Sequence, residues 1–583
     1  MNLRSALIIA GISFTIILLL ICTSALMAQS TAKPRADSIY VHANIYTGVV
    51  GDSSFHAVER ADAMAIRGDK ILAVGSEPEI LKLKGQETKV IDLGGRFVMP
   101  GFNDAHMHLT EAGFKSLTVD LTGTRSLQEF RDRLRKRVES SEPQEWITGS
   151  GWDETLWHDG QLPTRWDIDE VTTEHPVFLV RIDGHVAVAN TMALTMAHVT
   201  LATKDPVGGE IARDATGAPN GILRETAQSL VSSIIPEPTP DKHRQAIEAA
   251  LQDIARWGVT SVQDFSGDTP DDNLANFKIL EQLENQGKLT VRISEWLPFD
   301  TPVEALKQRR DQHPQSDAML HTGMLKAFMD GSLGSHTAAM LRPFTDDPHN
   351  SGLPRYEQAK LNQMAIDRVA AGFQLGFHAI GDKAVEMALD AFAAAEKAAH
   401  ESGVKARDGS ENFRLRVEHA QVTNPEQVGR FRQLKVIASM QPCHLLTDMH
   451  WAQARLGMER ASHSYAWAEF ANAGVPLAFG TDYPVEPVNP FRGLYVAITR
   501  KSEDGRQEYY PAQKLTIEQA IAAYTTGSAY AEFAEKQKGT LAAGMLADFV
   551  VLDRDITAIP AHDILGSRVL RTVVGGKTVY QAN

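Results

Sequence analysis

Cysteine is nearly absent from this chain. Only Cys22 and Cys443 occur in 583 residues, and Cys22 lies within an apolar segment at the N-terminus. Because a disulfide needs two thiols, removal of that segment would leave no pair of cysteines to bridge. The stability of the mature chain must therefore come from its packed core and from any metal that it binds.

An excess of positive charge is also missing. The chain has 58 Lys and Arg against 73 Asp and Glu, a net charge of −15. A nucleic-acid-binding surface needs basic side chains that face the phosphates, so we expect no nucleic-acid partner. With 43% hydrophobic and 22% charged residues, the composition is that of a globular protein, and the length allows more than one domain.

Long hydrophobic runs are missing too, with one exception at the N-terminus. Arg4 precedes an uncharged apolar stretch from Ala6 to about Met27. A short basic segment followed by an apolar segment and small residues is typical of a secretory signal. We interpret residues 1–28 as a signal peptide and expect export to the periplasm or the cell exterior. The alternative is an uncleaved membrane anchor at residues 6–27, since about 20 apolar residues can span a bilayer, and only then is the membrane a partner.

Short strand-like segments occur near both ends of the chain. Gly68-Asp69 marks a turn in the N-terminal group, and Gly575-Gly576 marks a hairpin in the C-terminal group. Neither group is large enough to form a stable domain alone. We therefore expect residues 37–98 and 538–583 to form one small β-sandwich, with the rest of the chain inserted between them.

The middle of the chain alternates between strand and helix patterns. Residues 241–257 place apolar side chains on one helical face, Gly258 ends the helix, and 259–265 follows as a buried strand. Eight such strand candidates predict an α/β fold with a (β/α)₈ TIM barrel at residues 99–537. About 150 residues separate the first two strands, far more than a βα unit needs. We interpret residues of about 120–240 as an insertion that folds over the barrel mouth.

Two histidines follow the first barrel strand. Pro100-Gly101 interrupts the preceding segment, and a short apolar strand then delivers His106 and His108. Residues i and i+2 of a strand face the same side, so both rings can bind one metal ion. With 20 histidines in the chain, such a pair is expected by chance roughly 0.7 times. The pair alone is therefore weak evidence for a metal site.

Further candidate ligands follow the other predicted strands. The active sites of (β/α)₈ barrels lie at the C-terminal ends of the strands. Lys326 and Asp330 follow the fourth strand, His378 the fifth, His419 the sixth and Asp482 the eighth. The recurrence of histidine, lysine and carboxylate at equivalent positions predicts that these side chains meet at one metal-binding edge.

Several motifs resemble the metal-dependent amidohydrolase superfamily. They are Pro100-Gly101-Phe102-x-Asp104-x-His106-x-His108, Gly258-Val259-Thr260, Gly480-Thr481-Asp482 and Gly539-Thr540-Leu541-x-x-Gly544-x-x-Ala547-Asp548. Longer segments are similar to the YtcJ-like branch (amidohydrolase family 3), which includes the N-substituted formamide deformylases. They are Gly151-Trp152-Asp153-Glu154, Pro163-Thr164-Arg165, Asp183-Gly184-His185 and Asp330-Gly331-Ser332-Leu333-Gly334-Ser335. The resemblance covers nearly the whole mature chain.

The resemblance implies a role for each candidate ligand. The histidine pair of the first strand and Asp482 bind the more buried metal, while His378 and His419 bind a second one. Lys326 stands where the superfamily can carry an N6-carboxylysine that bridges the two ions, because a carbamate is anionic whereas an ammonium cannot bind a cation. The implied cofactor is a divalent metal, with Zn²⁺ the expected ion, at one or two per chain.

Each ligand also has a plainer alternative. An unmodified Lys326 would pair with Asp330, leaving a single-metal site built from the histidines and Asp482. A buried histidine after an apolar strand is often only part of the core. Glu418 precedes His419 on one strand and should face the opposite way, which predicts a structural role for this carboxylate.

The resemblance implies hydrolysis by metal-activated hydroxide. The metal lowers the pKa of water and polarises a carbonyl, while Asp482 accepts the proton and passes it to the leaving nitrogen. Candidate substrate-binding residues, including donors to the oxyanion, are His185, Trp152, Asp330, His336 and His444. As alternatives, loop histidines are often surface residues and the tryptophans of an insertion often form its core.

We therefore predict a hydrolase of C–N bonds other than peptide bonds, acting on an amide, an N-substituted formamide or a related small molecule. A one-metal deaminase or cyclic-amide hydrolase is the second hypothesis, since one scaffold can support several chemistries. The third is an exported binding protein without turnover, against which the intact ligand set argues. The expected partner is the small-molecule substrate, and a homodimer stays open.

Overall fold

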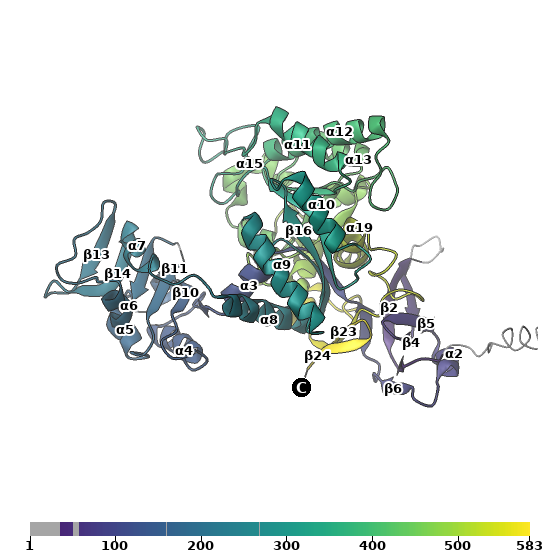
Figure 1. The fold of residues 1–583 in the computed structure, drawn as a ribbon, viewed down its shortest axis with the longest axis horizontal. Coiled ribbons are helices and arrows are strands. Elements are labelled where there is room, and N and C mark those ends of the chain that lie inside the picture. Colours follow the sequence, from purple (N-terminus) through teal and green to yellow (C-terminus); the bar gives the residue numbers. More distant parts are fainter. Residues whose placement is uncertain (1–34, 51–57, 159, 183, 268, 583) are drawn as a thin grey trace, which may run out of the picture.

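An eight-stranded parallel sheet forms the centre of the molecule. The computed structural model describes residues 35–50, 58–158, 160–182, 184–267 and 269–582. In spatial order the strands are β8 (Phe102–Met107), β15 (Val259–Asp264), β16 (Arg292–Pro298), β17 (Leu320–Phe328), β18 (Leu375–Ala379), β19 (Arg416–His419), β20 (Ile437–Met440) and β21 (Leu477–Phe479). Met107 forms a parallel bridge with Tyr483, just beyond β21, and so joins the first strand to the last. The predicted (β/α)₈ barrel is confirmed (Figure 1).

Helices surround this barrel. The helix before β15, α8 (Pro240–Arg256), begins with Pro240 and with the Thr239 hydroxyl accepting from the backbone N–H of Lys242. It buries the predicted apolar face against the barrel. The other helices of the barrel are α9 (Pro270–Asn285), α10 (Val303–Gln312), α11 (Gln358–Ala370), α12 (Asp382–Ser402), α13 (Pro425–Gln433), α14 (His444–Asp448), α15 (Ala452–Ser462), α16 (Trp467–Asn472), α17 (Pro490–Thr499), α18 (Ile517–Ala522) and α19 (Ser528–Ala531).

Two smaller sheets pack together at the N-terminal ends of the barrel strands. One joins both ends of the chain, in the order β24 (Lys577–Gln581), β23 (Val569–Val574), β22 (Phe549–Leu552), β7 (Phe97–Pro100), β2 (Asn44–Val50) and β3 (Val58–Ala61). The other has the order β5 (Lys70–Gly75), β4 (Ala63–Arg67), β1 (Ser38–Val41) and β6 (Lys89–Asp92), and α2 (Glu77–Ile80) packs against β4 and β5. The rings of Tyr40 and Phe549 meet edge to face at 5.1 Å between the two sheets.

Asp104 fastens the first barrel strand to the end of the eighth. Its carboxylate accepts hydrogen bonds from the Thr481 backbone N–H at 3.0 Å and the Thr481 hydroxyl at 2.5 Å. A Cβ on Gly480 would come within 2.5 Å of the His106 backbone nitrogen, so only glycine allows this approach. The two sequence motifs that contain these residues therefore form one structural unit next to the predicted ligands.

A buried ion pair connects the barrel to the sheet built from both chain ends. Arg292 of β16 donates two hydrogen bonds to Asp548, Nε to Oδ2 at 2.6 Å and Nη2 to Oδ1 at 2.9 Å. Both side chains are only 4% exposed. Asp548 also accepts from the backbone N–H of Gly575 in the C-terminal hairpin. The carboxylate thus holds three parts of the chain together.

We expect Asp548→Asn to lower the free energy of unfolding by about 3–5 kcal/mol, because it leaves the buried Arg292 guanidinium without its charge partner. Thermal and urea unfolding of the purified variant measure this loss. The control is Glu411→Gln, which removes an exposed ion pair with Lys405 and should change stability very little. Equal effects of the two substitutions would contradict the structural role of the buried pair.

Near the base of the barrel, the pKa of Glu284 is raised to about 7 by burial and by the adjacent Asp317. The unfolded chain releases this proton at a lower pH than the folded chain does. Stability therefore falls as the pH rises from about 4.3 to 7. We expect Glu284→Gln to stabilise the protein by roughly 1 kcal/mol at pH 8, after allowance for solvent screening, and to have no effect at pH 4. Unfolding midpoints at both pH values test this sign.

The long segment between β8 and β15 forms a second α/β unit. It contains α4 (Leu127–Val138), α5 (Arg165–Asp169), α6 (Thr191–Met196) and α7 (Ser229–Ser232). Its sheet has the order β13 (Gly209–Arg213), β14 (Pro219–Glu225), β12 (Val186–Ala189), β11 (Val177–Arg181), β10 (Ile147–Trp152) and β9 (Val119–Asp120). Two apolar clusters pack within this unit, so it has a core of its own.

The expected position of this insertion is wrong for this structure. The prediction placed it over the barrel mouth, whereas Figure 1 shows it standing away from the barrel, beyond α3 (Leu109–Ser116) and α8. The physical reason is that two apolar clusters give the insertion a core of its own, so it does not need the barrel surface to fold.

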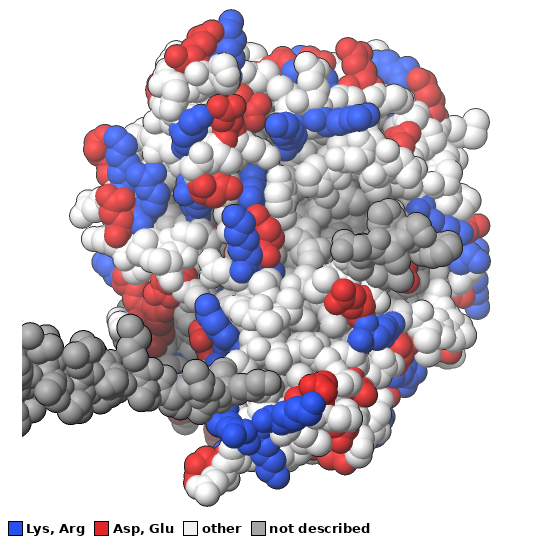
Figure 2. All heavy atoms as spheres, turned by 90° about the vertical axis from the view of Figure 1, so that its right-hand side faces the viewer, with Lys and Arg blue, Asp and Glu red and all other residues white. Residues whose placement is uncertain are grey.

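The surface carries charges of both signs. On the side where the N-terminal sheets lie, acidic and basic side chains are interspersed (Figure 2). Within the described ranges, no helix combines the length and the hydropathy that crossing a bilayer requires. The predicted signal peptide, residues 1–28, and the alternative anchor, residues 6–27, lie outside the described residues.

Candidate metal centre

The predicted ligands converge at the C-terminal end of the barrel. His106 is in β8, Lys326 in β17, His378 in β18 and His419 at the end of β19, while Asp482 follows β21. The ring centroids of His106 and His419 are 5.1 Å apart, and those of His378 and His419 are 4.4 Å apart. Side chains that are far apart in the sequence thus form one compact cluster.

The histidine pair presents the same nitrogen from each ring. His106 Nδ1 lies 2.9 Å from Glu418 Oε2, and His108 Nδ1 lies 2.6 Å from the carbonyl oxygen of Phe265. Because a carboxylate and a carbonyl only accept, both Nδ1 atoms donate, which leaves Nε2 of each ring as the lone-pair atom. Partners of this kind orient histidine ligands in metal sites.

Asp482 faces these two Nε2 atoms. Its Oδ1 lies 3.6 Å from His106 Nε2 and 3.1 Å from His108 Nε2. In a tetrahedral site with bonds of about 2.1 Å, ligand atoms are about 3.4 Å apart. Within the described structure no hydrogen bond satisfies this buried Oδ1 atom. The three atoms therefore fit a divalent cation.

The protonation states also suit a metal. Burial raises the pKa of Asp482, but His106, His108 and His444 together lower it well below its ordinary value. The pKa of His106 falls to about 3, because of burial and then because of the neighbouring Lys326. The carboxylate is therefore anionic and the imidazole neutral at pH 7, as metal binding requires.

Lys326 occupies the space in front of His106. Its Nζ lies 2.9 Å from His106 Nε2, and it is 5.3 Å from the ring centre of Trp296 and 5.0 Å from that of Phe328. Burial lowers its pKa to about 8. A cation on His106 Nε2 cannot coexist with an ammonium at this position, so the lysine must be neutral or modified when the metal is bound.

His378 and His419 form the other side of the cluster. His378 Nε2 lies 3.1 Å from the carbonyl oxygen of Gly331, which leaves Nδ1 as its lone-pair nitrogen. The buried Nδ1 of His419 has no hydrogen-bond partner among the described residues. Burial, and then the neighbouring His378, lowers the pKa of His419 well below its ordinary value. Both rings are therefore suited to bind a cation.

His444 completes this side of the cluster. It stands at the start of α14, its Nε2 lies 3.4 Å from Asp482 Oδ2, and its ring stacks on that of His419 at 5.7 Å. Two groups of ligand atoms, each within 4.8 Å, share one carboxylate: His106, His108 and Asp482, and His419, His444 and Asp482. The carboxylate thus connects two metal-binding groups.

The predicted orientation of Glu418 is wrong. Its side chain is fully buried and faces His106, and Arg416 Nε donates to its Oε1 at 2.6 Å. Strand alternation fails here because His419 has a φ of +73°, a left-handed conformation that lets neighbouring side chains point toward the same site. The spacing of Arg416 and Glu418, two residues apart on one strand, could have indicated that both side chains face the same side.

The other predicted substrate contacts lie elsewhere. Trp152 is in the core of the insertion, where its Nε1 donates to the Leu179 carbonyl oxygen at 3.2 Å. His185 is on the insertion surface beside Glu225, at 3.1 Å. Neither contacts the metal-binding cluster in this structure.

Two further residues belong to the loops that follow β17. The Asp330 carboxylate accepts from three backbone N–H groups, those of Ala339, Ile380 and Gly381. These bonds use both of its oxygens and hold the loop beside His378. His336 pairs with Asp346 at 3.1 Å at the barrel mouth.

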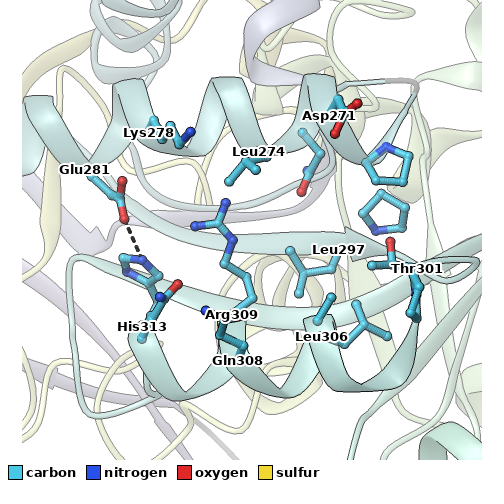
Figure 3. Close-up of a pocket in the computed structure, with 16 residues that line it drawn as sticks. Asp271, Leu274, Lys278, Glu281, Leu297, Thr301, Leu306, Gln308, Arg309 and His313 are labelled. Atoms are coloured by element: carbon cyan, nitrogen blue, oxygen red, sulfur yellow. Dashed lines mark ion pairs between the residues drawn. The ribbon is translucent and has the colours of Figure 1, made fainter.

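A separate groove of about 840 Å³ lies on the outside of the barrel between α9 and α10. In Figure 3 the Arg309 side chain extends between the two helices, and Glu281 pairs with His313 at 2.7 Å. None of the candidate ligands lines this groove. The groove is therefore separate from the metal-binding cluster at the barrel mouth.

Comparisons with known proteins give a consistent result. A family model described as "Amidohydrolase family" matches residues 89–580. The chain is 35% identical to Protein LONG AFTER FAR-RED 3 of Arabidopsis thaliana, over 94% of this chain and 92% of that protein. It is 31% identical to the putative amidohydrolase YtcJ of Bacillus subtilis (strain 168), with coverages of 90% and 96%.

The chain is also 26% identical to an N-substituted formamide deformylase of Arthrobacter pascens, over 94% of this chain and 98% of that enzyme. Among solved structures, an uncharacterized metal-dependent hydrolase from Pyrococcus horikoshii OT3 superposes with a TM-score of 0.69, at 29% identity, over 90% of this chain and 99% of that one. With histidine and aspartate groups that can bind a metal at the predicted edge of the barrel, the chain belongs to the amidohydrolase family and is a hydrolase of the metal-dependent type.

Proposed function

We propose that this protein hydrolyses the C–N bond of an amide, an N-substituted formamide or a related small molecule, with two Zn²⁺ ions and a carboxylated Lys326. The position of Asp482 carries the proposal, since its Oδ1 faces His106 and His108 and the carboxylate lies within 4.8 Å of a ring nitrogen of His419. Imidazole nitrogens with a carboxylate are a ligand set that zinc prefers. The similarity to an N-substituted formamide deformylase supports the choice of bond.

The position of Lys326 supports the proposal of a carboxylated lysine. Its Nζ is 2.9 Å from His106 Nε2, which is needed as a ligand. Its pKa, lowered to about 8 by burial, provides a fraction of neutral amine that can add to carbon dioxide. The N–C bond forms as the amine loses a proton, and the product is an anionic carbamate. This change replaces a repulsive cation with two oxygen ligands.

Each residue of the cluster would have a separate role in the reaction. When bound, the metal ions supply Lewis acidity and lower the pKa of water at the site. Asp482 accepts a proton from the attacking water and then donates it to the leaving nitrogen. His444, 3.4 Å from Asp482 Oδ2, is placed to donate a hydrogen bond to the oxygen of the substrate carbonyl. Glu418 keeps His106 in the tautomer that binds metal.

A substrate screen tests the proposal. Protein loaded with zinc in the presence of bicarbonate is incubated with N-formyl, N-acyl, cyclic-amide and amino-heterocycle compounds, and the released amine, acid or ammonia is measured. We expect turnover of N-formyl or N-acyl compounds and about two zinc ions per chain. Turnover confined to amino-heterocycles or cyclic amides with one metal per chain would support the alternative hypothesis and contradict this one.

A further inference from the structure

The insertion exposes an unusual share of apolar surface. Seven of the fourteen exposed large apolar side chains in the described part of the chain belong to it, among them Leu156 and Ile182. Both are 54% exposed, and they belong to neighbouring segments, since the Ile182 backbone N–H donates to the carbonyl oxygen of Trp152, four residues before Leu156. Large apolar side chains that gather on one unit of a protein commonly mark a contact surface.

The sequence motifs that the metal centre does not use lie at the same place. Arg181, the last residue of β11, pairs with Glu154 at 2.8 Å and so joins this strand to the segment that contains Leu156. We call Glu154, Leu156, Arg181 and Ile182 the motif edge of the insertion. These residues belong to or adjoin segments that resemble the YtcJ-like branch, yet in this structure they contact neither metal ligands nor the barrel mouth.

The barrel mouth exposes a second apolar surface. Four of the seven remaining exposed apolar side chains follow C-terminal ends of barrel strands: Leu341, Leu353, Met458 and Val485. Val485 is 64% exposed, and its backbone N–H donates to the carbonyl oxygen of Asp482 at 2.7 Å. The apolar rim therefore begins directly beside the metal centre.

The insertion is held away from the barrel mouth of its own chain. It is carried on α3 and α8, which pack so closely that a Cβ on Gly113 would come within 2.0 Å of the Ala246 carbonyl oxygen. Lys242 of α8 pairs with Glu145 at 2.8 Å, and Arg137 pairs with the same carboxylate at 3.0 Å. Rotation of the insertion onto its own barrel would break these ion pairs or open the helix contact.

We propose that the protein is a homodimer in which the motif edge of each copy covers the metal centre of the other copy. A second copy can bury both apolar surfaces without any change in the packing of α3 against α8. A two-fold symmetric arrangement lets each motif edge cover the metal centre of the other copy. The motif residues then line the entrance through which substrate reaches Asp482. The role of these residues at the substrate entrance rests on the proposed function, whereas the contact between the two copies does not.

Cross-linking between two copies tests the contact without any activity measurement. Ile182→Cys and Leu341→Cys are prepared separately with Cys22→Ser, mixed, and treated with a short bis-maleimide; the buried Cys443 stays unreactive because burial raises the pKa of its thiol. We expect a product of twice 63.9 kDa only in the mixture. Val50→Cys, equally exposed at 55% but on an N-terminal strand, replaces Ile182→Cys as the control. A double variant that cross-links within one chain at high dilution would overturn the proposal, as would a monomer in light scattering.

Complementation between two inactive variants tests the shared site. One copy carries Asp482→Asn and the other Ile182→Asp, and heterodimers are purified through two different tags. We expect about half of the wild-type turnover, because the intact insertion of the first copy covers the intact metal centre of the second. If each insertion served its own barrel, the heterodimer would be as poor as Ile182→Asp alone. Full activity of the Ile182→Asp homodimer would also contradict the proposal, whereas cross-links without turnover of any substrate would contradict only the proposed function.

Discussion

Asp482→Asn lowers kcat/KM by about 10³-fold or more and leaves the fold intact. The amide has nearly the size of the carboxylate, but it neither accepts a proton from water nor carries the charge that faces His106 and His108 at 3.6 and 3.1 Å. General acid–base catalysis alone contributes about 10²–10⁴-fold. The measurement is kcat/KM with the best substrate from the screen, together with circular dichroism and metal content.

The loss must be separated from a general effect of removing a carboxylate near the mouth. Asp346→Asn removes the partner of His336 and Arg455 in a mouth loop and should retain most activity. If Asp482→Asn kept wild-type turnover with both metals bound, the carboxylate would have no part in proton transfer. If it lost both metals and its fold, the residue would be structural instead.

Most of the cluster could be predicted because each ligand follows a buried barrel strand. Apolar runs such as Leu375–Ala379 are readable from the sequence, and parallel strands place their C-terminal ends at one edge. The polar residue that interrupts or follows each run must then face its counterparts. For the same reason the barrel could be predicted without knowing any contact.

The exceptions depend on information that strand periodicity does not contain. His419 reaches the same site as Glu418 because its backbone adopts a positive φ, which a non-glycine residue rarely does and the sequence pattern does not indicate. The Asp330 carboxylate accepts hydrogen bonds from one backbone N–H of its own loop and from two of the loop after β18, and such bonds form only after both loops are in place. The position of the insertion is set by the α3–α8 contact at Gly113, a packing detail between segments more than a hundred residues apart.

Lys326→Ala should reduce the metal content from two ions to one per chain and lower kcat/KM by more than about 100-fold. The substitution removes the only side chain in the cluster that can provide a bridging carbamate, and even partners outside the ligand set change metal affinity or activity by about 10–100-fold. It also leaves a gap beside Trp296 and Phe328 where Nζ lies at 5.3 and 5.0 Å from the rings. A small carboxylate fits such a gap. We therefore expect acetate or propionate to restore part of the second metal and of the activity.

Two variants make this result specific to the carbamate. Lys326→Arg keeps a positive charge near His106 Nε2 but does not form a stable carbamate. This variant should therefore lose the second metal ion, and acetate should restore neither that ion nor the activity. Asp482→Asn should likewise show no rescue by the same acids, since its defect is in proton transfer. Two metals in Lys326→Ala without added carboxylate would exclude a bridging role, because the histidines and Asp482 would then hold both ions by themselves. Loss of one metal with rescue only in Lys326→Ala would show that an anion at this position, rather than the lysine chain, holds the second ion.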